Sequence, residues 1–448
     1  MPDSESFLQR LQQTILQLRS QDLSVCYGRV QSVVGSRIEA SLPNARLGDA
    51  VSIAIRGREH AMRAEVVGLR DKRVLLSPYD AIHGIAVGDP VHAHLRGFRI
   101  PFGDSLLGRV VDALGEPLDQ SKSLSGQATR WLSLNHVPPP AITRPPINTP
   151  WCSGVRAIDT FCTLGEGQRV GLFASAGVGK SVLLAQLARD AAADVCVLCL
   201  IGERGRELRE FLDDVLGPEG LKRTVVVCAT SDTPSLVRAK SLATATRIAE
   251  GFRDEGKRVL LLVDSLTRYA RALREISLAN GEMPARRGYP ASVFTSLPVV
   301  LERAGTAARG CITAIYTVLV EGDSVDDPIA EEVRSLLDGH IVLQRELAER
   351  GRWPAIDPLQ SISRLFLKVS DSEHQHMATT LKALLQAYES KRDLIALGAH
   401  VPGHDALLDQ ALQHIDAIEA FLSQSPQESS AWSDTCALLR KLISQINA

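Results

Sequence analysis

The residues with the most specific chemistry lie at 174–181, where the letters ASAGVGKS form a Walker A phosphate-binding loop. The loop follows the apolar run 170–174 and opens a helix-like stretch at 181–188, which is the context that this motif requires. Its glycines let backbone N–H groups approach phosphate oxygens, its lysine supplies a cation, and its serine hydroxyl can ligate Mg²⁺. We expect nucleotide contacts from Ser175, Ala176, Gly177, Val178, Gly179, Lys180, Ser181 and Val182.

Asp264 is the candidate for a second magnesium ligand. It ends the apolar run 259–263, which predicts a buried strand. The carboxyl ends of such strands form the ligand-binding edge of open α/β sheets. We expect Asp264 to hold Mg²⁺ through water, close to Ser181. The alternative, a strand-terminal aspartate that only caps the next helix, is disfavoured by the Walker A loop on the same chain.

Hydrolysis also needs a group that orients or deprotonates a water molecule in line with the γ-phosphate. Glu203 is the candidate, because it follows the apolar run 194–201 and should lie at the same edge of the sheet. Arg204 could pair with this carboxylate or with a phosphate oxygen. Arg268, one helical turn after Asp264, could steady charge on the γ-phosphate. From spacing alone, an ordinary polar loop explains the segment 201–207 equally well.

These side chains can meet only if a sheet brings the ends of several strands together. Apolar runs predict strands at 169–174, 194–201, 223–229, 258–264, 311–319 and 339–343. Amphipathic runs between them predict helices at 180–192, 205–216, 234–255, 267–279, 290–304 and 327–337. Alternating strands and helices of this length predict an α/β domain with a mostly parallel sheet covered on both faces.

The flanking segments have a different character. Short alternating runs separated by Gly, Asp, Asn and Pro predict a small antiparallel barrel at 23–95. The proline-rich segment 137–146 is expected to be extended. Amphipathic runs such as 376–388 and 407–422 predict a helical region at the C-terminal end. Apolar residues at helical spacing in 1–20 predict an amphipathic arm, which either docks on its own protein or contacts a partner or a membrane.

Composition indicates a soluble intracellular protein. The 448 residues carry a formal net charge of −2, so no global basic field attracts nucleic acid or an anionic membrane. No apolar run approaches the roughly 20 residues needed to span a bilayer, and no secretory signal is visible. Cys196 and Cys199 have CxxC spacing within a predicted strand, where they face opposite sides and cannot share a metal. We expect His374 and His376 to lie on the solvated surface.

Several blocks together resemble the ATPases of type III secretion systems, both injectisome and flagellar, which are relatives of the catalytic subunit of the rotary ATP synthase. The blocks lie at 108–115, 165–181, 202–207, 264–269, 281–290 and 354–364, and the resemblance extends from about residue 25 to 425. It implies a RecA-like P-loop core at 96–365, preceded by a β-barrel oligomerisation domain at 23–95. It also implies a C-terminal helical domain at 366–448 that faces substrate–chaperone complexes, and an arm at 1–22 that contacts a stator protein or the membrane.

The resemblance also assigns roles to single residues. It implies a homohexamer with ATP and Mg²⁺ at each subunit interface, in which Glu203 is the catalytic carboxylate and Arg364 reaches the γ-phosphate of a neighbouring subunit. From the residues alone, Arg364 is one surface arginine among many. The resemblance makes Trp353 the ring that stacks on adenine; the family more often has tyrosine or phenylalanine there, and tryptophan can stack equally well.

The function implied by the resemblance is ATP hydrolysis that powers protein export, with substrate unfolding and chaperone release at a membrane-embedded export gate. A regulatory stator protein, a central stalk protein, the gate and chaperone–substrate complexes are the implied partners. The implied location is the cytoplasm, at the inner face of the bacterial inner membrane. Injectisome and flagellar export stay as alternatives, and the C-terminal tail favours the injectisome.

Three other functions fit the core less well. An RNA-translocating helicase would need a basic, aromatic-rich barrel, yet 23–95 has only Tyr27 and Tyr79 as aromatics, so no nucleic-acid partner is expected. A non-catalytic ring subunit could dispense with its catalytic groups, whereas Lys180, Glu203 and Asp264 are all present. A rotary ATPase subunit would carry an acidic lever segment after residue 399, which is missing here.

Overall fold

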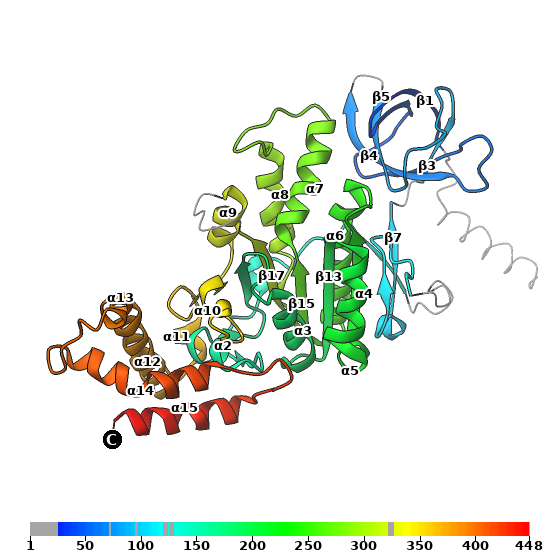
Figure 1. Cartoon of the computed structure of the whole chain (residues 1–448). Helices are drawn as coiled ribbons and strands as arrows, with labels where there is room; N and C mark the ends of the chain where they lie inside the picture. Colours follow the sequence, from blue (N-terminus) through cyan, green and yellow to red (C-terminus); the bar gives the residue numbers. More distant parts are fainter. Residues whose placement is uncertain are drawn as a thin grey trace, which may run out of the picture. The chain divides into compact units, whose positions relative to one another are not determined.

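The computed structural model describes residues 26–70, 73–94, 97–119, 124, 130–320 and 327–447. The predicted arm at 1–22 lies outside the described residues. The chain forms two compact units (Figure 1). One comprises the described part of Met1–Arg99 with Thr233–Val237 and Glu275–Met283, and the other comprises the remaining ranges.

In the first unit, six strands of the described chain close an antiparallel barrel in the order β1-β2-β5-β4-β3-β6. Alternating side chains fill its interior, because successive residues of a strand point to opposite faces. The barrel prediction is confirmed, but the sequence pattern missed the last strand, in which only Val91 and Ala93 face inward. The strands are β1 (Cys26–Val34), β2 (Arg37–Ser41), β3 (Ala50–Ile53), β4 (Met62–Arg70), β5 (Arg73–Pro78) and β6 (Pro90–His94).

The second unit is built on a sheet in the order β19-β18-β12-β17-β15-β13-β14-β8. Its central strands pair in parallel and are buried on both faces, which is why each reads as a continuous apolar run. The predicted α/β fold is therefore confirmed. The strands are β8 (Val110–Val111), β12 (Arg169–Ala174), β13 (Val195–Glu203), β14 (Thr224–Thr230), β15 (Arg258–Asp264), β17 (Cys311–Leu319), β18 (Gly339–Leu343) and β19 (Ile362–Ser363).

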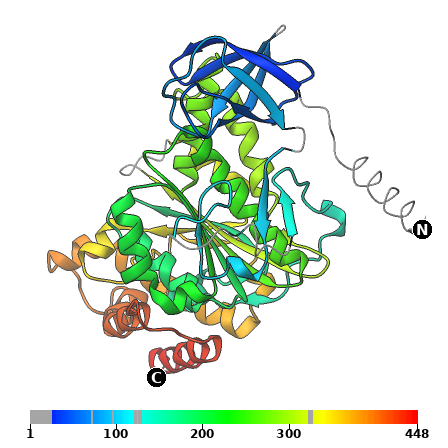
Figure 2. The same ribbon diagram turned by 90° about the vertical axis from the view of Figure 1, so that its right-hand side faces the viewer.

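Helices cover both faces of this sheet (Figures 1 and 2). The helix expected at 205–216 is instead α4 (Gly205–Glu210), followed by a π-helical turn at Phe211–Leu216 and α5 (Gly217–Lys222). The longer helices are α3 (Lys180–Asp190), α6 (Ser235–Asp254), α7 (Leu266–Ala279), α8 (Ala291–Leu301) and α9 (Pro328–Leu336). Shorter elements are β7 (Arg99–Phe102), β9 (Arg130–Ser133), β10 (Pro150–Trp151), α2 (Arg156–Phe161), β11 (Leu164–Gly165), β16 (Gly305–Thr306), α10 (Arg345–Glu349) and α11 (Phe366–Val369).

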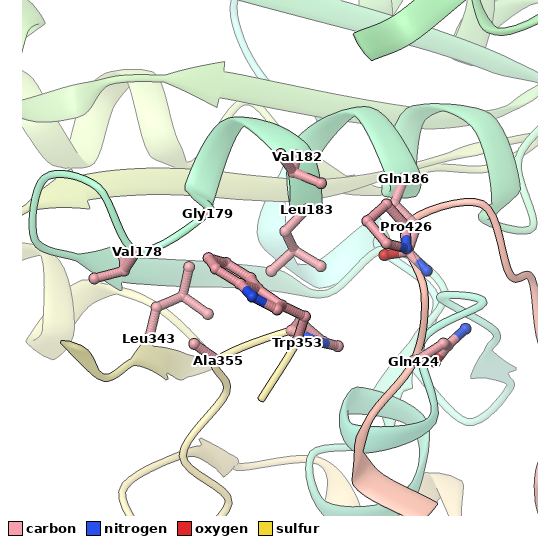
Figure 3. Close-up of a pocket in the computed structure, with 11 residues that line it drawn as sticks. Val178, Gly179, Val182, Leu183, Gln186, Leu343, Trp353, Ala355, Gln424 and Pro426 are labelled. Carbon is pink, nitrogen blue, oxygen red and sulfur yellow. The ribbon is translucent and has the colours of Figure 1, made fainter. Parts of the chain in front are cut away.

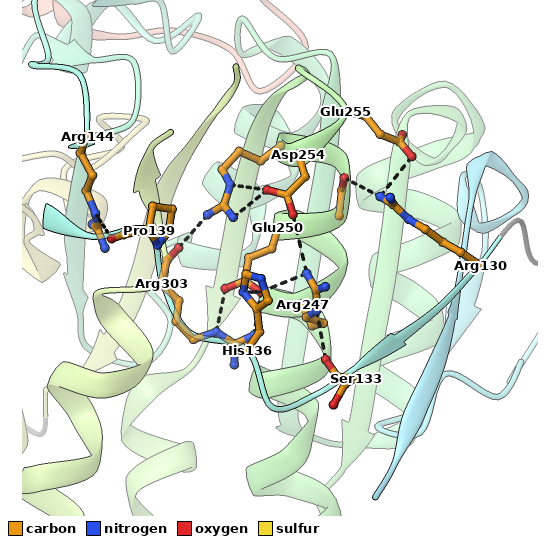
Figure 4. Close-up of polar contacts among 12 residues, drawn as sticks. Arg130, Ser133, His136, Pro139, Arg144, Arg247, Glu250, Asp254, Glu255 and Arg303 are labelled. Carbon is orange, nitrogen blue, oxygen red and sulfur yellow. Dashed lines mark hydrogen bonds and ion pairs between the residues drawn. The ribbon is translucent and has the colours of Figure 1, made fainter. Parts of the chain in front are cut away.

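A buried ionic network ties the segment before the proline-rich stretch to α6 (Figure 4). Glu250 is fully buried, and Arg303 donates to both of its carboxylate oxygens at 2.8 Å. Arg247 approaches the same carboxylate at 3.4 Å while it donates to the backbone oxygen of Ser133, and His136 Nδ1 lies 3.0 Å from Glu250 Oε2. The two guanidinium groups compensate the desolvation of a carboxylate that water cannot reach.

Within the described residues, the chain from 366 onward is helical apart from its connecting loops, as predicted. The main helices are α12 (Ser372–Ser390), α13 (Arg392–Ala396), α14 (Ala406–Leu422) and α15 (Trp432–Ile446). The side chains of Asp371 and Asp405 cap α12 and α14 by accepting hydrogen bonds from free backbone N–H groups. None of the described helices is long and apolar enough to cross a membrane.

The prediction of a solvated His374 is wrong, whereas His376 is exposed. The His374 ring is buried, lies 3.1 Å from the Thr160 carbonyl oxygen and stacks on Trp432 with ring centroids 5.3 Å apart. His374 shares one helical face with the buried Met377 and with Leu381. Burial lowers the pKa of His374, so we infer that the ring packs as a neutral imidazole.

Candidate active site

Parallel pairing brings the three predicted functional strand ends to one edge of the sheet. Leu200 of β13 lies opposite Asp264 of β15, so Glu203 continues beyond the same edge. On the other side of β15, β17 pairs with β12, whose last residue leads into the phosphate-binding loop. The carboxyl edge therefore carries the loop, the aspartate and the glutamate together, as the spacing of the strands predicts.

The phosphate-binding loop has the backbone geometry that an anion site needs. Gly177 and Gly179 have positive φ angles of 80° and 83°, a region that other residues rarely adopt. Gly179 is also the N-cap of α3, so α3 begins at Lys180 with its free N–H groups at the loop. A helix N-terminus that follows such a loop favours phosphate binding through these N–H groups and the helix dipole.

Lys180 and Asp264 bind each other directly. The ammonium group of Lys180 donates to both carboxylate oxygens of Asp264, whose side chain is 4% exposed. Thr317, from the neighbouring strand β17, donates to Asp264 Oδ1 at 2.9 Å. The sequence does not single out Thr317, because Thr313 and Tyr316 of the same strand also carry hydroxyl groups. These contacts fix the carboxylate beside the phosphate-binding loop.

Arg268 holds the predicted catalytic carboxylate. Its Nη1 lies 2.7 Å from Glu203 Oε1 and donates to the Gly202 carbonyl oxygen at 2.6 Å. Burial raises the pKa of Glu203 and the charge of Asp264 raises it further, while Arg268 and Lys180 lower it. A carboxylate with a raised pKa is a stronger base than a free glutamate and can accept a proton more readily.

Ser181, Glu203 and Asp264 line one cavity of about 230 Å³, together with apolar residues of β13 and α4 and the π-helical turn. A serine hydroxyl and a carboxylate are hard oxygen donors, and Mg²⁺ prefers such donors while it keeps several water molecules. Both donors face the same cavity, which also has room for water. The residues present therefore fit a magnesium ion bound with a nucleotide.

The structure does not bring Arg204 to this cavity. Arg204 is the N-cap of α4, its side chain is 79% exposed, and it pairs with Glu207 at 3.1 Å. The neighbouring Arg206 likewise pairs along the helix, with Glu210. The predicted contact of Arg204 with Glu203 is therefore absent from the described structure, and Arg268 occupies that position instead.

Arg364 lies at the opposite edge of the sheet from the phosphate-binding loop. It follows β19, in which Ser363 pairs with Gly339 at the start of β18. The other end of β18, Leu343, is the one that aligns with Ala174 before the loop. The two ends lie four residue positions apart, a distance of about 13 Å along the strand. The exposed Arg364 side chain is therefore poorly placed to serve the loop of its own chain.

Trp353 closes a second pocket beside the phosphate-binding loop (Figure 3). Its indole packs on Gly179, where an added Cβ would lie only 1.9 Å from the ring atom Cζ3. Apolar side chains form the walls, and Gln186, Gln424 and Pro426 complete the lining. None of these three residues was predicted from the sequence. Gln186 lies one helical turn after Val182, a signal that could have identified it, whereas residues 424 and 426 had none.

A pH profile tests the contact between Arg268 and Glu203. Glu203 must be deprotonated to accept a proton, so activity should fall as pH drops through its pKa. Because Arg268 lowers that pKa, we expect Arg268→Gln to move the acidic limb of the kcat/KM profile to higher pH. Arg268→Lys, which keeps the charge, is the matched control and should move it less. An unchanged profile in Arg268→Gln would show that the pair does not set the protonation of the base.

Comparison with known proteins agrees with this geometry. Residues 154–363 match the ATP synthase alpha/beta family, nucleotide-binding domain, and residues 30–93 match the beta-barrel domain of the same family. Residues 370–441 match the T3SS EscN ATPase C-terminal domain. The fold and the site thus define a P-loop nucleotide-binding protein of the ATP synthase alpha/beta type.

Similar proteins narrow this class. The type 3 secretion system ATPase of Xanthomonas euvesicatoria is 47% identical over 92% of this chain and 93% of its own length. The SPI-2 type 3 secretion system ATPase of Salmonella typhimurium is 50% identical over 90% and 91%. The flagellum-specific ATP synthase of Bacillus subtilis is 45% identical over 93% and 95%. The chain belongs to the family of type 3 secretion and flagellar ATPases.

Solved structures give the same result. The assembled ATPase EscN from the type III secretion system of enteropathogenic E. coli has a TM-score of 0.87 and 45% identity, and the match covers 93% of this chain and 100% of that one. EscN in complex with its central stalk EscO has a TM-score of 0.85 and 44% identity, with the same coverage.

Proposed function

We propose that this chain hydrolyses ATP to drive protein export through a type III secretion apparatus. The observation that carries the proposal is the contact of Arg268 with Glu203 at the sheet edge where Lys180 and Asp264 also meet. A half-buried carboxylate with a raised pKa, fixed beside a phosphate-binding loop, is suited to activate water for attack on a phosphoryl group.

Each residue has a defined role in the proposed reaction. The N–H groups of residues 175–182 bind the phosphates, and Lys180 moves from Asp264 to the β- and γ-phosphates. Glu203 orients the attacking water and accepts its proton, while Arg268 holds the carboxylate in place. Ser181 and Asp264 would hold Mg²⁺, which neutralises charge on the β- and γ-phosphates. Trp353 stacks on the adenine ring.

The position of Arg364 supports a site shared between subunits. Because Arg364 lies at the far edge of the sheet from its own loop, we propose that it contacts the γ-phosphate bound by a neighbouring chain. Such an arginine stabilises charge that develops in the transition state. The arrangement implies a closed homohexameric ring, and the similar protein EscN is described as assembled.

The C-terminal helices offer a surface for cargo. Leu394, Leu397, Val401 and Leu407, at the end of the α12–α14 hairpin, are 51%, 80%, 56% and 43% exposed. Apolar side chains gathered on an exposed tip mark an interaction site. We propose that this tip contacts export substrates and their chaperones, that a central stalk occupies the ring, and that the arm at 1–22 binds a stator protein at the cytoplasmic face of the inner membrane, next to the export gate.

Purified full-length chain should release phosphate from ATP in the presence of Mg²⁺. The rate per chain should rise with protein concentration, because isolated chains lack the neighbour's arginine. Lys180→Ala should abolish both this activity and export of a reporter substrate in cells that lack the natural chain. Flat specific activity from dilute to concentrated protein would contradict the shared site. Binding of ATP without hydrolysis would contradict the proposed enzymatic activity.

A further inference from the structure

The pocket beside the phosphate-binding loop contains a feature that could read the nucleotide base. We propose that the side-chain carbonyl oxygen of Gln186 accepts a hydrogen bond from the 6-amino group of adenine and thereby makes the enzyme prefer ATP to GTP. The proposal rests on the proposed function and adds a specificity-determining residue to it.

Apolar groups form most of the pocket lining, so they bind any purine without distinguishing one from another. Besides the Trp353 indole, the polar side chains that line it belong to Gln186 and Gln424. Gln424 is fully engaged: its oxygen accepts from the Arg156 backbone N–H at 2.9 Å, and its amide nitrogen donates to the carbonyl oxygens of Gly154 and Glu428 at 2.8 Å. Of the two glutamines, Gln186 is therefore the one that is available to recognise the base.

The contacts of Gln186 fix which end of its amide is left without a protein partner. Its Nε2 donates to the Glu428 carbonyl oxygen at 3.0 Å. A carbonyl oxygen can only accept, so the nitrogen must face Glu428 and the oxygen must be the other end of the amide. Among the described residues no group donates a hydrogen bond to that oxygen. The residue is only 2% exposed, and the oxygen keeps part of that small accessible surface, because it is not one of the fully buried atoms that lack a partner. Figure 3 shows Gln186 beside Pro426, beyond Leu183 and Trp353.

An acceptor that has no protein donor and little access to water favours a ligand that supplies a donor. Adenine carries a donor at position 6, whereas guanine carries a carbonyl oxygen there, which would leave two acceptors facing each other. Turning the amide over would place its oxygen against the Glu428 carbonyl oxygen. Adapting to guanine would therefore cost the side chain its hydrogen bond to Glu428. The pocket has free space of about 10 Å³, so the Trp353 indole must turn aside before it can stack on a purine.

Competition against a fluorescent ATP analogue measures this preference on the unmodified full-length protein. We expect GTP to bind about tenfold more weakly than ATP, and purine riboside triphosphate, which lacks only the amino group, to bind several-fold more weakly. Equal affinity for ATP and purine riboside triphosphate would overturn the proposal while leaving ATP hydrolysis in place. Failure to bind ATP at all would overturn the proposed function itself.

Two substitutions separate the acceptor of Gln186 from its donor. Gln186→Met removes both, and the ratio of GTP to ATP dissociation constants should fall towards one. Gln186→Lys keeps a donor for the Glu428 carbonyl oxygen but has no acceptor, so it should lose the preference for ATP as Gln186→Met does. If Gln186→Lys keeps the preference while Gln186→Met loses it, Gln186 acts only by holding the loop at Glu428, and base reading is rejected. An unchanged ratio in Gln186→Met would reject it as well.

Discussion

Glu203→Gln should leave ATP binding intact while lowering turnover by about 10²- to 10⁴-fold. The amide has nearly the shape of the carboxylate, and its oxygen can still accept from Arg268, which donates across 2.7 Å in the structure. It cannot accept the proton of the attacking water, so the chemical step alone is lost. Phosphate release gives the turnover, and competition against a fluorescent nucleotide gives the affinity.

Glu207→Gln is the matched control for this substitution. Glu207 lines the same cavity, yet it pairs with the exposed Arg204 at 3.1 Å and is itself half exposed. Exposed pairs of this kind contribute little to stability or charge at the site, so we expect activity within about twofold of the unmodified chain. Two results would reject Glu203 as the base. One is a Glu203→Gln variant that turns over ATP as fast as the unmodified chain, and the other is an equal loss of activity in both variants.

The central strands and the phosphate-binding loop could be predicted because their signals are local. A parallel strand buried on both faces gives an unbroken apolar run, so β13 and β15 were found within two residues of their bounds. Strands of two residues, such as β8 and β19, are too short to show any periodicity. The π-helical turn at Phe211–Leu216 continues an ordinary helical pattern, and nothing in the sequence marks it.

Contacts across long sequence distances could not be predicted. Asp264 was found from its strand, but its partner Thr317 lies 53 residues further along the chain. Gln424 and Pro426 reach the pocket only because the loop after α14 folds back on α3. His374 was misjudged because a histidine at the start of a helix is usually solvated, and only packing against Trp432 shows that its ring is buried.

Mixing two inactive variants should restore activity if the site is shared between chains. Arg364→Ala should lose about 10³-fold of its activity, as the loss of an arginine finger does, and Glu203→Gln is also inactive. In a mixed ring, an Arg364→Ala chain still supplies Glu203, and its Glu203→Gln neighbour still supplies Arg364. At equal amounts, about one quarter of the interfaces in a closed ring combine both intact groups. Phosphate release from the mixture measures the recovery.

The mixture distinguishes the two possible positions of Arg364 because each chain carries one defect. If Arg364 served the loop of its own chain, every site would lack either the arginine or the glutamate, and mixing would restore nothing. The pairing of β19 with the start of β18 places Arg364 away from its own loop and predicts recovery. Mixing Arg364→Ala with Lys180→Ala should recover activity in the same way, since Lys180 and Glu203 act on the same side of the interface. No recovery in either mixture, with rings shown to form, would place the arginine outside the shared site.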